Sequence, residues 1–475
     1  MSQKQKLNVG FIGVDQICFT GDKTAEFQKG LAALGALQKE LGFTLTPYSG
    51  TIITREQADE AAVFFKKAET DFLLVQNSSF AAGETILPLA KTGIPLGLWA
   101  VPEPAAKGTL PLNSLCGVNM YASIIKNYLK EHSLKYKYFF GYGDEFANRF
   151  RITVRALTAI KRMRRAKVAL VGGIAPGFND LYFDERIIEK KLGVNVQRNH
   201  EYADIKDTAM AYPQDDIQEY IAESLSGYCS LCEGADENIQ INARFLKAYN
   251  EFAEKNGYEA LAVSCWPKIQ ADFLACNCHS MAKLNQRGVI ASCEGDLPGA
   301  LGMLMLRYLS DEKPVTLLDL VACDEQDDTL QLWHCGPTAE YFAGAEGVRM
   351  GTIEEDTPTP GKRRYLRYTQ DMTFRAGAAT VSMFCDDFDN MFVAGGAFID
   401  YPKDRYNGSA GWLGKLTLNR RPITARNMLH TILSRGVQHH YPVAFGDCTK
   451  ELMEVSAWLG MGLIQEAAYE DYLIR

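Results

Sequence analysis

Short apolar runs in the first third of the chain alternate with amphipathic stretches. The runs cover residues 7–13, 72–76 and 94–100, and a glycine, polar or proline turn adjoins each of them. Continuous apolar runs of this kind are typical of parallel strands covered on both faces. Residues 23–41 have helical spacing and stop at Gly42, as helices commonly do. The pattern predicts an α/β layered domain.

A new strand pattern after residue 167 predicts a second α/β domain. The basic stretch 161–167 precedes it at the end of a predicted helix, where cations complement the helix dipole. A solvated helix end therefore explains these charges better than a nucleic-acid site. The predicted strands and helices that follow are 168–173, 184–192, 261–265, 280–287, 289–293 and 299–309. The strand at 289–293 delivers Glu294 at its carboxyl end, where open α/β sheets gather ligands.

The pattern changes again near residue 315. Short β-rich pieces separated by glycine, proline and aspartate turns occur at 364–368, 379–384 and 390–394, and helical spacing returns at 449–459. The predicted fold class is α/β, with two α/β layered domains followed by a β-rich C-terminal domain. The predicted domain ranges are 1–163, 164–314 and 315–475.

Composition narrows the class of protein. A chain of 475 residues is too long for one core and suggests about three domains. With 47% hydrophobic and 23% charged residues the chain is globular, and a net charge of −8 argues against a nucleic-acid partner. No secretory signal and no apolar run of roughly 18 residues is visible, so we expect a cytoplasmic protein without a membrane partner.

The twelve cysteines are scattered, as buried thiols in a reducing compartment would be. One grouping allows an alternative, a zinc or iron–sulfur site at Cys229, Cys232, Cys276 and Cys278. Its second pair has one intervening residue instead of two, which departs from the usual zinc spacing. The glycine-rich segment 171–177 lacks the spacing of a nucleotide-binding loop.

Two carboxylates followed by three histidines form the strongest chemical signal. Glu294 comes at a strand end, Asp319 lies within an apolar run, and His334 and the adjacent His439 and His440 follow. Oxygen and imidazole ligands suit a divalent ion such as Mn²⁺, Mg²⁺ or Co²⁺. A carboxylate beside such an ion can also move protons during catalysis. The order predicts a metal-dependent catalytic site.

Structural roles compete with this interpretation. Asp296, just before Leu297-Pro-Gly, suits a helix N-cap, whereas Glu294 is placed too early for that role. A lone Asp319 in an apolar run needs a partner, because an unpaired buried charge is costly. If His439 and His440 both lie on a strand, they point to opposite faces, so at most one ligates the ion and the other faces the substrate or supports a ligand.

Several stretches resemble the L-fucose/L-arabinose isomerase superfamily. Residues 168–180 and 192–196 resemble the central domain of fucose isomerases, and 293–296 resembles the segment that supplies the first metal carboxylate. Asp319 has the spacing of the second carboxylate. The resemblance implies two Rossmann-like α/β layered domains followed by a β-rich domain, as in fucose and arabinose isomerases.

The late histidines extend the resemblance. His440 matches the last metal histidine, while His334 and His439 match the pattern of the arabinose group. The resemblance implies an aldose–ketose isomerase with Mn²⁺ as the usual ion. Glu294 and Asp319 would be both metal ligands and the acid and base of an ene-diol proton transfer. The substrate would be a pentose, a 6-deoxyhexose or an anionic 6-modified hexose.

The family also builds its pocket between subunits, which implies a homotrimer or homohexamer. Trp99 resembles an N-domain tryptophan that faces the sugar, and an indole suits the apolar side of a sugar ring. A core role for Trp99 is the alternative. Gln16, Phe178 and Trp266 are further candidates for substrate contacts.

Departures from the family pattern leave other possibilities open. The first 160 residues match neither group clearly, and Lys268 stands where related sequences tend to carry an acidic residue. A cation there favours a sugar with a sulfonate, phosphate or carboxylate. A non-catalytic sugar-binding relative is the remaining alternative, although the proton-transfer carboxylates are present.

Overall fold

The computed structural model describes residues 6–130, 134–231, 235–356 and 360–468. The chain divides into two compact units, Met1–Lys161 and Arg162–Arg475. The finer division of the second unit at residue 314 stays a prediction. Within the described ranges, no helix is both long enough and apolar enough to cross a bilayer.

The first unit is a five-stranded parallel sheet in the order β2-β1-β3-β4-β5. The strands are β1 (Asn8–Val14), β2 (Thr44–Ile52), β3 (Phe72–Asn77), β4 (Leu96–Ala100) and β5 (Tyr136–Phe140). The helices are α1 (Lys23–Leu41), α2 (Arg55–Lys67), α3 (Ile86–Ala90), α4 (Ser114–Ser123) and α5 (Asp144–Met163). Strands β3 and β4 are buried along their whole length, as their continuous apolar runs predict.

The second unit begins with a four-stranded parallel sheet in the order β7-β6-β8-β9. Its strands are β6 (Lys167–Val171), β7 (Asn195–His200), β8 (Ala260–Val263) and β9 (Ile290–Ser292). Its helices are α6 (Glu185–Leu192), α7 (Tyr202–Ala211), α8 (Gln218–Ser226), α9 (Ala235–Asn256), α10 (Lys268–Phe273), α11 (Cys278–Arg287) and α12 (Leu297–Leu309). The mixed α/β prediction is confirmed.

A closed antiparallel barrel follows. Its strands pair in the ring β16-β11-β10-β18-β14-β15, and β15 pairs back to β16. They are β10 (Thr316–Asp324), β11 (Thr329–His334), β14 (Gly377–Cys385), β15 (Asn390–Phe398), β16 (Ser409–Leu418) and β18 (His440–Phe445). Closure leaves the ring without an open edge. The predicted β-rich C-terminal region is confirmed.

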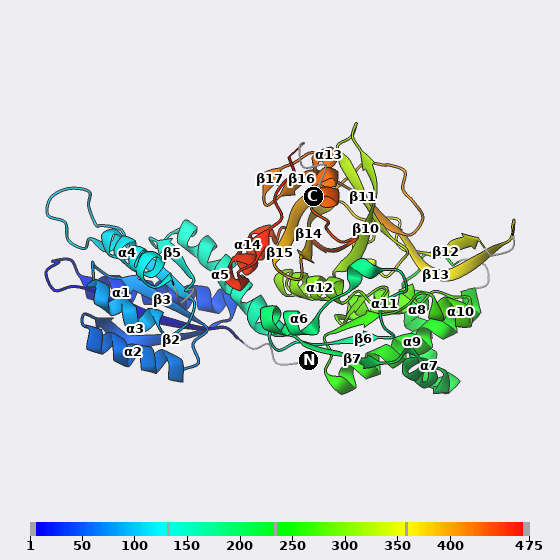
Figure 1. Cartoon of the computed structure of the whole chain (residues 1–475), viewed down its shortest axis with the longest axis horizontal. Helices are drawn as coiled ribbons and strands as arrows, with labels where there is room; N and C mark the ends of the chain where they lie inside the picture. The colour runs from blue at the N-terminus through cyan, green and yellow to red at the C-terminus, as the bar shows by residue number, and fades with distance from the viewer. Residues whose placement is uncertain (1–5, 131–133, 232–234, 357–359, 469–475) are drawn as a thin grey trace. The chain divides into compact units, whose positions relative to one another are not determined.

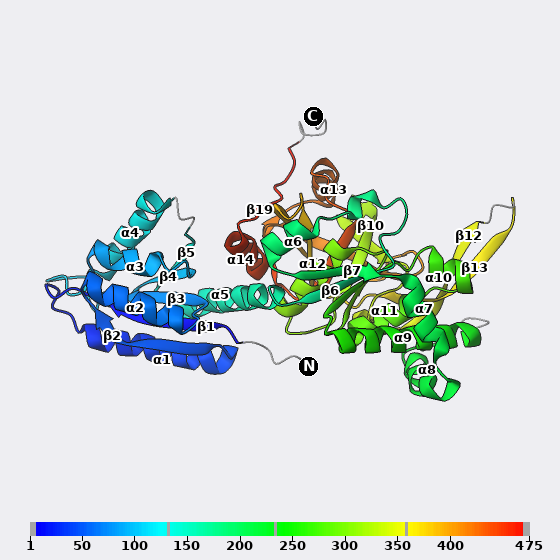
Figure 2. The ribbon, with the colours of Figure 1, turned by 60° about the horizontal axis from the view of Figure 1, so that its bottom comes forward.

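The remaining elements extend or cover the barrel. They are the ribbon β12 (Arg349–Asp356) and β13 (Arg363–Thr373), the short strands β17 (Arg421–Pro422) and β19 (Gly462–Leu463), and the helices α13 (Ala425–Ser434) and α14 (Thr449–Leu459). Helix α12 lies between the parallel sheet and the barrel (Figures 1 and 2), and all of it except Arg307 and Tyr308 is buried. This helix joins the two β structures into one unit.

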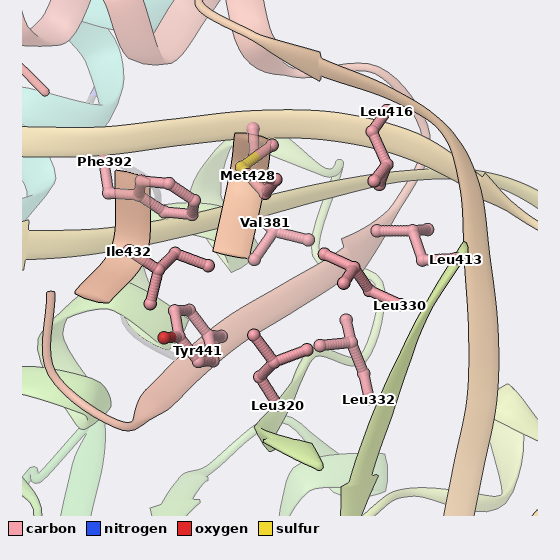
Figure 3. A pocket seen from close by; sticks show the side chains of 11 residues that line it. Leu320, Leu330, Leu332, Val381, Phe392, Leu413, Leu416, Met428, Ile432 and Tyr441 are labelled. Atoms are coloured by element: carbon pink, nitrogen blue, oxygen red, sulfur yellow. The ribbon is translucent and has the colours of Figure 1, made fainter. Parts of the chain in front are cut away.

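Apolar side chains fill the inside of the barrel and leave a cavity of about 20 Å³. Leu320, Leu332 and Tyr441 point into this interior (Figure 3). Asp319 is paired with Trp333 on β11 and with His440 on β18. Since neighbouring residues of a strand alternate in direction, Asp319 and His440 project from the outer face of the barrel.

Candidate active site

The loop between β9 and α12 places Glu294. Glu294 has φ of 62° and the following Gly295 has φ of 72°. A Cβ on Gly295 would lie 2.2 Å from the carbonyl oxygen of Gly173, so only glycine fits there. The carbonyl oxygen of Glu294 accepts a hydrogen bond from the Ala175 N–H at 2.9 Å. Left-handed backbone at a non-glycine residue is strained, and strain of this kind gathers at functional sites.

Asp296 connects the start of α12 to the barrel. Its Oδ1 accepts the Gly299 N–H at 2.8 Å, which confirms the predicted N-cap. Its Oδ2 lies 3.0 Å from Nδ1 of His440, and both side chains are fully buried. This second contact orients the His440 ring, so that Nε2 faces the two catalytic candidates. The sequence argument found the cap and missed the histidine contact.

The predicted carboxylates and His440 come together. His440 Nε2 lies 3.1 Å from Glu294 Oε2 and 3.5 Å from Asp319 Oδ1. His334 joins the group, since one side-chain ligand atom each of Glu294, His334 and His440 lies within 4.8 Å of the others. The structure therefore gathers residues from three distant parts of the sequence into one cluster.

His439 also reaches the cluster. Its Nε2 is 3.9 Å from Glu294 Oε2, and its Nδ1 is 2.6 Å from Asp180 Oδ2. The expectation that His439 and His440 point to opposite faces is wrong. Strand β18 begins only at His440, so strand alternation does not govern His439.

The two predicted aromatic contacts lie side by side, and one of them adjoins His439. The Phe178 ring lies 5.5 Å from the His439 ring and 6.0 Å from Trp266. Trp266 also lines a cavity of about 180 Å³ next to Glu294, Asp319 and His334. The cavity is further lined by Cys265, Gln270, Cys276, Asn277, Cys278, Cys293, Trp333, Cys335, Ile353 and Glu355. A space of this size beside the cluster can admit a substrate.

The other two predicted contacts belong to the first unit. Trp99 is fully buried in its core, stacks on Phe146 at 4.3 Å and donates its indole N–H to the Gly141 carbonyl oxygen at 2.8 Å. This placement corresponds to the core alternative for Trp99. Gln16 follows β1, is partly exposed, and donates its backbone N–H to Ser79 Oγ at 3.0 Å.

The described residues do not assemble the predicted alternative cysteine site. Cys229 is exposed and directs its thiol toward the Glu346 carbonyl oxygen, whereas Cys276 and Cys278 are buried. Cys232 lies outside the described residues. The grouped metal-ligand candidates in the described ranges do not include Cys229.

Electrostatics keep opposite charges facing each other in the cluster. Burial opposes ionisation of Glu294, but His439 and His440 lower its pKa to about 2. Burial also disfavours the charged form of His334, yet Cys335 and Asp319 raise its pKa to about 9. Burial raises the pKa of Asp319, against the attraction of the histidines. The ionised Glu294 carboxylate therefore favours positive charge on the neighbouring imidazoles or on a bound cation.

The donor set fits a hard divalent ion. Asp319 Oδ1, His334 Nε2 and His440 Nε2 are buried and make no hydrogen bond within the described part of the chain. Buried polar atoms without hydrogen bonds are uncommon, and converging ones are typical of a ligand site. Carboxylate oxygens and imidazole nitrogens suit Mn²⁺, Mg²⁺ or Co²⁺.

The protein has a mixed α/β fold with a cluster of carboxylates and histidines, and comparison with known proteins gives the class as isomerase. The chain is 27% identical to a sulfoquinovose isomerase of Alkalicoccus urumqiensis, over 83% of this chain and 86% of that protein. It is 26% identical to a sulfoquinovose isomerase of Priestia megaterium, covering 83% and 85%, and 24% identical to one of a Clostridium species, covering 84% and 87%. The chain is an enzyme of the isomerase class.

Comparisons with family models and with solved structures give no further information on function. No family model matches the chain. A solute-binding protein of Actinobacillus succinogenes with bound D-allose shares 12% identity, over 66% of this chain and 85% of that one, with a TM-score of 0.18. A likeness at that score supports no conclusion.

Proposed function

We propose that the chain is an aldose–ketose isomerase that acts on a hexose with an anionic group at C6, and that sulfoquinovose is its substrate. The observation that carries the proposal is the convergence of Glu294 and Asp319 on His440, beside a cavity of about 180 Å³ that both carboxylates line. The similarity to sulfoquinovose isomerases over most of both chains supports the choice of sugar.

The reaction moves one hydrogen between adjacent carbons. One carboxylate removes the proton from C2 of the aldose, which leaves an ene-diol, and a proton is delivered to C1 to give the 2-ketose. Glu294 and Asp319 would exchange these protons, and the proposal is supported by their approach to His440 and by the cavity that both of them line. The second proton moves between the oxygens on C1 and C2, so the atoms balance without an external reactant.

A divalent ion completes this site in our proposal. Glu294, Asp319 and His440 would hold it, with Mn²⁺ as the first choice and Mg²⁺ or Co²⁺ as alternatives. The bound ion would polarise the sugar carbonyl and acidify the neighbouring hydroxyl. Asp296 holds His440 for this purpose, and Asp180 holds His439 beside it.

Lys268 is the candidate for recognising the anionic group. It starts α10, two residues after the cavity-lining Trp266, and its Nζ donates to the Gly172 carbonyl oxygen at 3.2 Å. Its side chain is exposed, so it can meet a sulfonate without the cost of burying a charge. The aromatic pair Phe178 and Trp266 would pack against the apolar face of the sugar.

A sugar panel tests the proposed function. Metal-stripped protein is assayed with and without Mn²⁺ on sulfoquinovose, glucose 6-phosphate, L-fucose, L-rhamnose and L-arabinose, and ketose formation is measured. We expect Mn²⁺-dependent conversion of the 6-sulfonated sugar, with less conversion of the neutral sugars. Conversion of neutral sugars alone would reject the anionic substrate, and conversion that is unaffected by metal removal would reject the metal.

The oligomeric state is also a proposal. Fucose and arabinose isomerases, which the chain resembles, place the N-terminal domain of one subunit over the pocket of the next, so we propose a homotrimer or homohexamer. Light scattering coupled to gel filtration distinguishes these states from a monomer.

A further inference from the structure

Thiols gather beside the catalytic carboxylates, and the proposed reaction uses none of them. The Sγ of Cys335 lies 3.6 Å from the Sγ of Cys278 and 3.2 Å from Nδ1 of His334. Cys293 belongs to the same group, because one ligand atom each of Cys293, His334 and Cys335 lies within 4.8 Å of the others. Cys265 continues the cluster, with its Sγ 2.8 Å from that of Cys293.

Three separate segments bring these thiols together. Cys293 follows β9, Cys278 is the first residue of α11, and Cys335 follows β11. Cys278 and Cys293 are buried and Cys335 is partly buried. The cavity of about 180 Å³ is lined by all three, so an ion from solvent has a route to them.

One pair of thiols has the spacing of ligands on a tetrahedral ion. Zinc–sulfur bonds of about 2.3 Å in a tetrahedron separate two sulfur ligands by roughly 3.8 Å, close to the 3.6 Å between Cys278 and Cys335. Thiolate and imidazole ligands prefer zinc and similar soft ions over Mn²⁺ or Mg²⁺. The oxygen-rich group of Glu294, Asp319 and His440 has the opposite preference.

We propose that Cys293, Cys335 and His334, with Cys278 next to Cys335, form a second metal site, which binds a thiophilic divalent ion such as Zn²⁺. Each coordinating thiol releases its proton to solvent when the ion binds, and no oxidation or reduction occurs. His334 belongs to both candidate ligand groups. A zinc ion held beside Nδ1 of His334 adds positive charge next to the oxygen-rich site, which should weaken ion binding there and slow sugar conversion. This last consequence rests on the proposed function, whereas zinc binding itself does not.

The test follows the metal directly. Reduced, metal-free full-length protein is titrated with Co²⁺, and the thiolate-to-cobalt charge-transfer absorption is recorded. We expect one equivalent of Co²⁺ to produce this band, an equivalent of Zn²⁺ to remove it, and excess Mn²⁺ to leave it unchanged. Absence of the band at stoichiometric Co²⁺ would overturn the proposal, whether or not the protein converts sugars.

Variants locate the site. Cys335→Ser and Cys293→Ser should each weaken Co²⁺ binding more than about tenfold. Cys385→Ser, which alters another buried cysteine in the barrel strand β14, should leave the band intact. A band that survives both Cys335→Ser and Cys293→Ser would place the ion elsewhere and reject this site.

Protection from alkylation gives a result that does not depend on the variants folding. Zn²⁺ should slow modification of Cys278, Cys293 and Cys335 in the unaltered protein, as mapped by mass spectrometry, and leave the exposed Cys18 and Cys116 reactive. Equal modification of the three cluster thiols with and without Zn²⁺ would contradict the proposal.

Discussion

Asp296 links the cap of α12 to the candidate active site through one carboxylate. One of its oxygens caps α12, and the other lies 3.0 Å from Nδ1 of His440. The sequence indicates the cap, because a cap depends only on residues a few positions away. The contact with His440 joins positions 144 residues apart, and no local pattern reports it. The contact between Asp180 and His439 also joins distant positions, and no local sequence pattern indicates it.

Asp296→Asn tests this double role. The amide can still cap the helix, but it loses the charge that holds the His440 ring. We expect Mn²⁺ affinity to fall by about 10- to 100-fold with a loss of unfolding free energy no greater than about 1 kcal/mol. Isothermal titration measures the affinity. Asp184→Asn, at the N-cap of α6, is the matched control and should leave affinity unchanged; equal affinity in Asp296→Asn would contradict the positioning role.

Lys268 tests recognition of the substrate anion. Removing its exposed cation should raise KM for a 6-sulfonated hexose by about 5- to 50-fold, which corresponds to about 1–2 kcal/mol of binding free energy. KM for neutral sugars should stay unchanged. Steady-state kinetics of Lys268→Ala measure both values. Lys255→Ala, an exposed lysine at the end of α9, is the control. An unchanged KM for the anionic sugar would reject Lys268 as the residue that recognises the anion.

At the scale of elements, the candidate site depends on strand pairings and on one loop that bring Glu294, Asp319 and His440 close together. Asp319 faces His440 because β10 and β18 pair antiparallel in that register, and Glu294 is set by the turn after β9. The individual strands were predictable from their apolar runs. Their partners were not, because strand pairing between distant segments leaves little trace in local periodicity.

Gly295→Ala tests the turn that places Glu294. A methyl group there clashes with the Gly173 carbonyl oxygen, so the turn must shift. We expect a loss of about 1–3 kcal/mol of unfolding free energy together with loss of Mn²⁺ binding, as measured by thermal unfolding and titration. Gly257→Ala has a similar positive φ of 70° with open space around it, and should lose stability only. Intact Mn²⁺ binding in Gly295→Ala would show that the turn does not set the ligand.

At the scale of the whole molecule, the sequence predicted layered α/β regions before a β-rich one, and the structure confirms this order. It did not predict that the β-rich region closes, because closure depends on the return pairing of β15 with β16. Trp99 shows a second limit of prediction from sequence. An apolar strand can carry an aromatic residue for a core or for a ligand, and only packing distinguishes them.

Trp99→Phe distinguishes these roles. Because Trp99 is fully buried and stacked on Phe146, the smaller ring should lower the stability of the first unit by about 1–3 kcal/mol. KM and kcat should stay within about twofold of the unaltered enzyme, a difference of less than 0.5 kcal/mol. Denaturant unfolding and steady-state kinetics provide the two measurements. A selective rise in KM with unchanged stability would support a tryptophan that faces the sugar.

The central claim is that Glu294 and Asp319 isomerise a 6-anionic hexose with the help of a divalent ion. The most direct measurement follows sulfoquinovose by proton NMR with the Mn²⁺-loaded enzyme and with its Glu294→Gln and Asp319→Asn variants. Asp389→Asn, which alters an exposed carboxylate outside the cluster, is the control. We expect conversion to the 2-ketose by the unaltered enzyme and by Asp389→Asn. Each site variant should lose at least about 1,000-fold in rate, or about 4 kcal/mol of transition-state stabilisation. Undiminished conversion by Glu294→Gln or Asp319→Asn would contradict it.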